Sequence, residues 1–166
     1  AMEIVEVESD VGSMHHEDVI GEEVYEEMAH EIRKLCVWAV MSDDGASGRV
    51  DNFPGSQPVS LSRSNMELLK REPYSVTWKA DGTRYLLMLM RDGTYLIDRK
   101  FAIRRVQMRF LLPHKKFGTN VHHCTLMDGE MVVDTDPQTK KQTRRYLAYD
   151  LMAINGERVT QRPFLE

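Results

Sequence analysis

The sequence predicts an α+β domain in which antiparallel sheets are flanked by helices. One amphipathic stretch lies near the N-terminus, and from residue 74 onward short β-branched and aromatic runs alternate with polar turn sequences. At 166 residues the chain is long enough for one packed core, and its 42% hydrophobic and 29% charged residues are ordinary for a globular protein. Because no apolar run approaches the roughly 20 residues of a membrane span, we expect no membrane partner.

The first part of the chain is acidic. Residues 1–31 contain eleven acidic side chains and no Lys or Arg, so the rest carries 22 basic against 15 acidic residues, although the net charge is −4. Residues 1–21 show no apolar periodicity and predict a linker or tail with little fixed structure, whose deletion should leave the thermal midpoint nearly unchanged. The basic remainder suits a polyanionic substrate, but many proteins that bind no polyanion share this balance.

Two helices are predicted before the strands. In residues 22–41 apolar side chains recur every three or four positions, which is typical of an amphipathic helix that packs on a sheet. Residues 42–48 are polar and Gly-rich and predict a loop. A second, short helix is expected at 65–70, with Ser64 as its N-cap.

The remaining elements are predicted strands that form two hairpins. The strands are expected at residues 74–78, 85–90, 95–98, 131–134 and 145–151. The first hairpin turns at Asp92-Gly93, which is a strong turn signal. The second turns through the polar residues 135–144. Residues 113–120 are basic and contain a glycine, and they predict a loop.

The most specific chemical signal is the sequence Lys-Ala-Asp-Gly-Thr-Arg at residues 79–84. Lys79 follows a predicted strand and precedes a tight turn, so its amine is exposed at a fixed point. Attack on an α-phosphate needs a neutral amine, whereas a free lysine, with a pKa of about 10.4, is mostly protonated. Arg84 is a candidate for the neighbouring cation that favours the neutral form, and it can also contact phosphate or sugar oxygens. Taken alone, the hexapeptide also fits a solvated lysine beside a common turn.

Three further motifs follow in order. Residues 95–99 are Tyr-Leu-Ile-Asp-Arg, residues 126–132 are Leu-Met-Asp-Gly-Glu-Met-Val, and residues 145–150 are Arg-Tyr-Leu-Ala-Tyr-Asp. Together with residues 79–84 and the segment 53–61, they resemble the nucleotidyltransferase motifs of eukaryotic mRNA capping enzymes of the bifunctional phosphatase-guanylyltransferase type. Chance agreement of all these motifs over most of the chain is remote.

The resemblance implies the antiparallel-sheet nucleotidyltransferase fold, which is ATP-grasp-like and shared by DNA ligases and mRNA capping enzymes. Residues 22–166 would form the N-terminal part of that domain. The family continues after the position of residue 166 with a metal-binding carboxylate, phosphate-binding lysines and an OB-fold lid. We therefore expect an incomplete domain without the lid, and we expect this chain to be inactive by itself.

The resemblance also implies the reaction and the residues that perform it. Lys79 would attack the α-phosphate of GTP to form a lysyl-GMP intermediate, and GMP would then pass to the 5′-diphosphate end of nascent mRNA to give the GpppN cap. Arg84 and Arg99 would bind the nucleotide, with Arg99 on its ribose. Glu130 would accept a ribose hydroxyl or orient a metal-bound water.

The implied cofactor is Mg²⁺ or Mn²⁺, and the implied partners are GTP, the 5′-diphosphate RNA end and the C-terminal domain of RNA polymerase II in the nucleus. The residues present show no metal-ligand spacing of their own. Cys36 and Cys124 predict free thiols in a reducing compartment. Taken without the motif at residues 126–132, Asp128-Gly129 would predict a turn before a strand. Tyr149 is expected to pack in the core, and Asp150 is a weaker site candidate.

Two alternatives remain at this point. A fragment of an ATP-dependent polynucleotide ligase would share the lysine motif and the mechanism, and the residues present do not distinguish guanine from adenine. A truncated, non-catalytic module that binds RNA or a protein partner would keep the motifs without turnover. Trp78, the segment 53–61 and residues 145–150 favour the capping enzyme.

Overall fold

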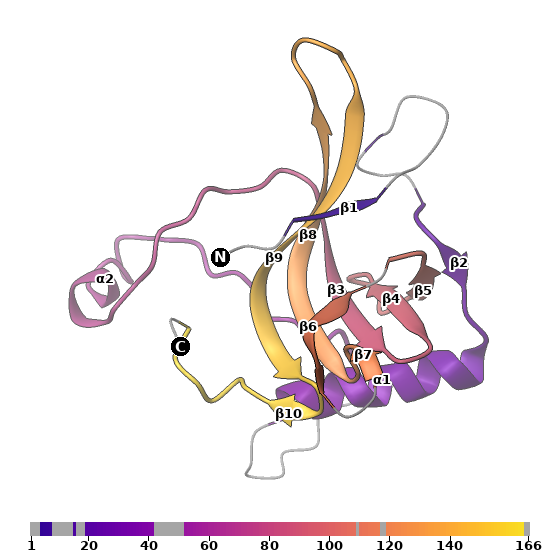
Figure 1. Cartoon of the computed structure of the whole chain (residues 1–166). Helices are drawn as coiled ribbons and strands as arrows, with labels where there is room; N and C mark the ends of the chain where they lie inside the picture. Colours follow the sequence, from indigo (N-terminus) through magenta and orange to yellow (C-terminus); the bar gives the residue numbers. More distant parts are fainter. Residues whose placement is uncertain are drawn as a thin grey trace.

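A mostly antiparallel sheet that curves over one long helix makes up the fold (Figure 1). The computed structural model describes residues 4–7, 15, 19–41, 52–108, 110–116 and 119–164. Within them the main sheet has the order β1-β9-β8-β3-β4-β5-β2, and β10 pairs with β9. Its strands are β1 (Ile4–Val7), β2 (Glu22–Glu23), β3 (Thr83–Met90), β4 (Gly93–Ile97), β5 (Ile103–Val106), β8 (Thr125–Thr135), β9 (Gln142–Ile154) and β10 (Glu157–Arg158).

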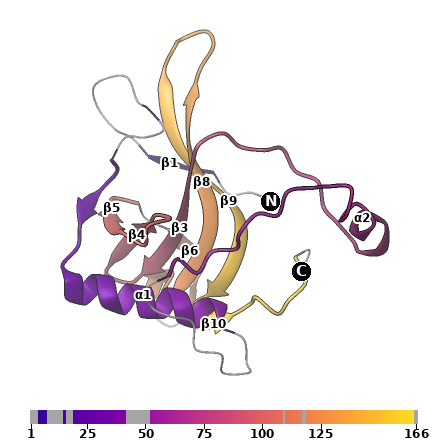
Figure 2. The ribbon, with the colours of Figure 1, turned by 180° about the vertical axis from the view of Figure 1, so that it is seen from behind.

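The two predicted hairpins are confirmed. β3 and β4 meet through a tight turn at Arg91-Asp92, with Met90 opposite Gly93. β8 and β9 form a longer hairpin than the sequence indicated, and its tip projects from the body of the sheet (Figures 1 and 2). Asp136 shapes that tip, because its Oδ1 accepts the N–H groups of Gln138 and Thr139 at 2.9 and 2.6 Å. The side-chain acceptor replaces ladder bonds where the chain turns.

The two faces of the sheet bury different sets of side chains, as alternation along strands requires. The helix α1 (Glu26–Val40) lies across one face, where Leu86, Met88 and Leu126 are buried against it. The opposite face carries a second apolar cluster. That cluster contains Leu87, Leu89, Leu96, Val106, Met108, Met131 and Tyr146. The functional site described below lies on the helix-facing side.

The long helix begins later than predicted. α1 starts at Glu26, whereas Glu22 and Glu23 form β2 and pair with Arg105 and Arg104 of β5. The Glu23 carboxylate also accepts a hydrogen bond from Arg104 Nη1 at 3.2 Å. These two acidic residues, which precede the first apolar position of the helix, therefore pair with a basic strand instead. The predicted loop at 42–48 lies outside the described residues.

The short helix is also displaced from its predicted position. α2 spans Leu68–Arg71 and has Glu67, not Ser64, at its N-cap. The side chain of Asn65 stabilises the preceding turn, because it accepts the Ser62 N–H at 2.7 Å and donates to the Ser60 carbonyl at 3.0 Å. A local side-chain bond of this kind competes with helix formation. Figure 1 shows α2 well away from the sheet.

The strand predicted at residues 74–78 does not form. Its β-branched and aromatic side chains are exposed, with Val76 99% and Trp78 63% accessible. β3, which follows directly, already has β8 on one side and β4 on the other, so no open edge is available beside it. Strand propensity reflects how well side chains pack on a half-buried sheet surface. Among the described residues, this segment has no such surface to pack on.

The predicted basic loop at 113–120 is wrong as well. β6 (Leu111–Lys116) and β7 (Thr119–Val121) form a two-stranded antiparallel sheet, with Leu111 opposite Val121. A short hairpin can be closed by one such apolar pair, so the basic composition between them does not prevent strand formation.

Both cysteines are free and buried, as predicted. Burial raises the pKa of the Cys36 thiol to about 12. No helix in the described ranges combines the length and apolarity needed to cross a bilayer.

Part of the predicted tail is structured. Ile4–Val7 forms β1 and pairs with Arg144–Leu147 of β9, in contrast to the expectation of little fixed structure for residues 1–21. At the other edge, the carbonyls of Ile20 and Gly21 accept hydrogen bonds from Arg104 at 3.1 and 2.8 Å. Residues 4–7 are thus held by backbone pairing, and residues 20–21 by hydrogen bonds from one arginine. Neither kind of contact requires a periodic pattern of apolar side chains.

Deleting residues 1–21 is accordingly expected to lower the thermal midpoint by roughly 4–8 °C, since a loss of about 2 kcal/mol shifts a chain of this size by 2–4 °C per kcal/mol. The loss comes from the acceptors of Arg104 and the ladder of β1. Thermal unfolding followed by circular dichroism measures it, with deletion of residues 1–3 as the control. An unchanged midpoint would show that the pairing contributes nothing to stability.

Candidate active site

A pocket of about 830 Å³ opens on the helix-facing side of the sheet. Arg84 and Glu130 lie opposite each other on β3 and β8, and Asp128 lies opposite Leu86, so all three share the face that α1 covers further along. Segments distant in sequence complete the walls. The lining residues are Ser56, Gln57, Pro58, Thr77, Trp78, Lys79, Ala80, Gly82, Thr83, Arg84, Tyr85, Asp98, Arg99, Lys100, Asp128, Glu130, Leu147, Tyr149 and Asp150.

A buried ion pair forms the floor of the pocket. Arg84 Nε donates to Asp128 Oδ1 at 2.9 Å, and Arg84 Nη2 contacts Asp128 Oδ2. Their side chains are only 10% and 2% exposed. The hydrogen bonds to Asp128 raise the pKa of Arg84 above its already high ordinary value. Bidentate geometry of this kind is the strong form of a carboxylate–guanidinium contact.

The same guanidinium reaches the opposite wall. Arg84 Nη1 donates to the carbonyl oxygen of Ser56 at 2.7 Å, and the guanidinium carbon lies 5.5 Å from the centre of the Phe53 ring. Arg84 therefore ties β3 and β8 to a segment about thirty residues earlier in the chain. Asp128 balances the charge of Arg84. Arg84 therefore offers a ligand hydrogen-bond donors but little net positive charge.

A β-bulge in β9 brings a tyrosine into this cluster. Asp128 is opposite Asp150 and Gly129 is opposite Ala148, so Tyr149 is an extra residue in β9. Its hydroxyl donates to Asp128 Oδ1 at 3.0 Å. Burial, followed by the charge of Asp128, raises the pKa of Tyr149 to about 12, so the hydroxyl keeps its proton at neutral pH. The prediction that Tyr149 only packs in the core is wrong.

The lysine lies on a loop that is fixed to β8. Lys79 is exposed, and its Nζ donates to the carbonyl of Ala80 at 3.3 Å. Three residues later, the Gly82 N–H donates to Glu130 Oε1 at 2.9 Å. A Cβ at Gly82 would lie 2.2 Å from the Met131 carbonyl oxygen, which only glycine avoids. Glu130 and Gly82 thus set where the loop carrying Lys79 meets the sheet.

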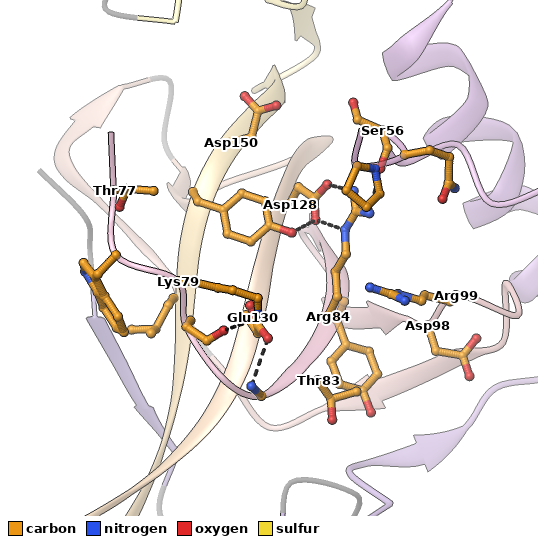
Figure 3. A pocket seen from close by; sticks show the side chains of 18 of the residues that line it. Ser56, Thr77, Lys79, Thr83, Arg84, Asp98, Arg99, Asp128, Glu130 and Asp150 are labelled. Carbon is orange, nitrogen blue, oxygen red and sulfur yellow. Dashed lines mark hydrogen bonds and ion pairs between the residues drawn. The ribbon is translucent and has the colours of Figure 1, made fainter. Parts of the chain in front are cut away.

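Arg99 is placed at the pocket rim by the turn after β4. Asp98 Oδ1 accepts the N–H groups of Lys100 and Ala102 at 2.8 and 2.9 Å. This side-chain turn leaves Arg99 exposed beside the pocket. Figure 3 shows Lys79 and Glu130 on one side of Arg84, and Asp98 and Arg99 on the other.

All four residues predicted for the site, Lys79, Arg84, Arg99 and Glu130, line this one pocket, and so does Asp150. Their individual roles stay predictions. Asp128 was not predicted as a site residue, since an Asp-Gly pair favours a turn. In the structure this pair lies inside β8, and a Cβ at Gly129 would lie 2.5 Å from the ring of Tyr146. The glycine is required by packing, not by a turn.

The pocket does not supply a complete set of metal ligands. Among the residues that the structure describes, no group of three or more His, Cys, Asp or Glu side chains is placed to hold an ion. The predicted Mg²⁺ or Mn²⁺ stays a prediction, because a nucleotide-bound Mg²⁺ needs only one or two protein carboxylates. No chemical step below passes through a metal.

A lysine, arginines and a glutamate gathered on an antiparallel sheet are groups that a nucleotidyltransferase site would use. The sequence model of the mRNA capping enzyme catalytic domain matches residues 14–166. The chain belongs to this family of nucleotidyltransferases. The match includes every residue of the pocket described above.

Curated relatives agree with this assignment. The chain is 42% identical over 114 residues to the mRNA-capping enzyme subunit alpha of Schizosaccharomyces pombe, covering 64% of this chain and 28% of the relative. It is 39% identical over 114 residues to the mRNA-capping enzyme of Danio rerio, and 40% over 107 residues to that of Mus musculus. These matches cover 68% and 64% of this chain, and 18% of each relative. The chain thus spans less than a third of the length of these proteins.

Proposed function

We propose that this chain carries the nucleophile of an mRNA guanylyltransferase. The observation that carries the proposal is the placement of Lys79: an exposed amine, on a loop fixed by the Gly82–Glu130 hydrogen bond, at the mouth of a pocket that Arg84 and Arg99 line. An amine held in this way can approach a phosphorus atom without a further change in the sheet.

The proposed reaction has two steps. The neutral Nζ of Lys79 attacks the α-phosphorus of GTP, a P–N bond forms, the bond to the β-phosphate breaks, and pyrophosphate leaves. A terminal oxygen of the 5′-diphosphate RNA end then attacks the same phosphorus, and the P–N bond breaks to release lysine and the GpppN cap. The covalent intermediate allows one site to serve two acceptors.

The geometry supports distinct roles for the other side chains. Glu130 uses Oε1 for the Gly82 N–H, which leaves Oε2 for a ribose hydroxyl. Arg99 is exposed and close to the pocket rim, where it can bind ribose or phosphate oxygens. Arg84 is engaged by Asp128 and Ser56, and it contributes only its remaining N–H groups.

The proposal extends to the setting of the reaction. We propose that the sheet is the ATP-grasp-like nucleotidyltransferase fold shared with DNA ligases. Mg²⁺ or Mn²⁺ would accompany the triphosphate, because charge develops on phosphate oxygens in both steps. The nucleus and the C-terminal domain of RNA polymerase II are the proposed location and partner, on the basis of the family.

The proposed activity is tested by covalent labelling with α-labelled GTP or ATP and Mg²⁺. Two proteins are compared: the 166-residue chain, and a chimaera that continues after Glu166 with the corresponding remainder of the Schizosaccharomyces pombe subunit. We expect the chimaera to be labelled by GTP and much less by ATP, with a bond that is acid-labile and alkali-stable, as a phosphoamide is. The chain alone should be labelled negligibly. Preferential labelling by ATP would favour a ligase, and no labelling of either protein would favour a non-catalytic module.

A further inference from the structure

The guanidinium of Arg84 is the point where the pocket floor and one wall are joined. Three of its five N–H groups are used, two on Asp128 and one on the Ser56 carbonyl. The geometry is rigid, because a planar guanidinium held at two nitrogens by one carboxylate cannot rotate without breaking both bonds.

The wall is shaped around this group. Gly55 is buried, and a Cβ there would lie 2.3 Å from Phe53 Cε1 and 3.0 Å from Arg84 Nη2. The Phe53 ring lies against the guanidinium on one side and makes an edge contact with Phe101, with 6.4 Å between ring centres. Residues 53–56 therefore enclose Arg84, and their position depends on where Arg84 is held.

Asp128 on β8 and Tyr149 on β9 in turn hold Arg84 in place. Asp128 accepts from Arg84 at both carboxylate oxygens, and its Oδ1 also accepts the Tyr149 hydroxyl at 3.0 Å. Tyr149 lies beside this oxygen because β9 pairs with β8: Gly129 is opposite Ala148, and Tyr149 and Asp150 both face Asp128 across the bulge. Neither Asp128 nor Tyr149 needs to touch a reacting atom to affect the pocket.

We propose that Asp128 and Tyr149 are positioning residues of the nucleotide pocket, which fix Arg84 so that it holds the wall of residues 53–57 against a bound nucleoside triphosphate. The identity of the ligand rests on the proposed function. The role of the network does not, because its contacts are made within the protein. The net positive charge that attracts the triphosphate then comes from Arg99 and Lys100 at the rim.

The position of the wall can be measured directly in the 166-residue chain labelled with 4-fluorophenylalanine. The chain has five phenylalanines, and Phe53→Leu assigns the resonance of Phe53. We expect Asp128→Asn to shift or broaden this fluorine resonance, while that of the exposed Phe164 stays in place as an internal control. Asp134→Asn is the matched control, because Asp134 also lies on β8 and pairs with an arginine, but at the surface.

Binding is measured by titration with GTP of the chimaera described above, carrying the same substitutions. Asp128→Asn is expected to weaken binding about tenfold, and Tyr149→Phe, which removes one hydrogen bond and keeps the ion pair, about threefold. Asp134→Asn and Tyr25→Phe should bind as the wild type does. Tyr25 is the matched control for Tyr149, since its side chain is exposed and outside the pocket.

The two readouts separate the possible failures. An unchanged Phe53 resonance in folded Asp128→Asn and in Tyr149→Phe overturns the positioning role. A displaced resonance with unchanged GTP affinity overturns the link between the wall and the nucleotide. If Asp128→Asn does not fold, the Phe53 resonance and the GTP affinity of Tyr149→Phe test the proposal instead. If the wild-type chimaera does not bind GTP while Phe53 responds as expected, the proposed function fails and the positioning of the wall is retained.

Discussion

Replacing Lys79 by arginine is expected to abolish covalent labelling by GTP in the completed domain. A guanidinium stays protonated at neutral pH and has no lone pair for attack on phosphorus, whereas the positive charge is retained. Because the other pocket residues are unchanged, GTP binding itself should fall by no more than about threefold. Labelling followed by gel electrophoresis measures the first quantity, and equilibrium titration measures the second.

Lys70→Arg is the matched control, since Lys70 is exposed on α2, pairs with Glu67 and lies outside the pocket. Its labelling should equal that of the unaltered protein. Labelling that persists in Lys79→Arg would show that another residue is the nucleophile, and it would remove the central argument for the proposed reaction.

Asp128→Ala is expected to have the largest effect on stability, a loss of about 3–5 kcal/mol in the free energy of unfolding. It leaves the guanidinium of Arg84 without its carboxylate in a site where that side chain is only 10% exposed. The double replacement Arg84→Met with Asp128→Leu should be less destabilised than the single variant, because no uncompensated charge stays buried. Urea unfolding followed by circular dichroism measures the stability of both variants relative to the unaltered chain.

Asp134→Ala serves as the surface control, with an expected loss of about 0–1 kcal/mol, since its ion pair with Arg145 is partly solvated. Equal losses for Asp128→Ala and Asp134→Ala would contradict a structural role for the buried pair. A double variant as unstable as the single one would show that the apolar pair does not fill the space.

The sequence was most informative where local chemistry decides the structure. The Asp92-Gly93 turn signal predicted the first hairpin. The resemblance grouped Lys79, Arg84, Arg99 and Glu130 in one site, and these residues line one pocket, while their roles stay predictions. These signals depend on neighbours within a few residues or on the family as a whole. Neither needs knowledge of which strands pair.

The predictions were wrong where the structure of a segment depends on which strands pair. Residues 74–78 have strong strand propensity, yet both sides of the adjacent β3 are occupied. Glu22 and Glu23 were assigned to the helix because they adjoin its apolar period, yet they pair with β5. Asp128 and Tyr149 meet through the pairing of β8 with β9, which no spacing along the chain shows.

Two irregular positions in β9 change which of its residues lie on each side of the sheet. A second register shift, between Leu126 and Met127, makes Met152 an extra residue as well. The β9 partners of Glu130, Asp128 and Leu126 are consequently Leu147, Asp150 and Ala153, a spacing of three instead of two. Over this stretch an extended chain therefore has nearly the periodicity of a helix. Any alignment or design that assumes strict alternation from Leu147 onward would assign Asp150 and Met152 to the wrong side of the sheet.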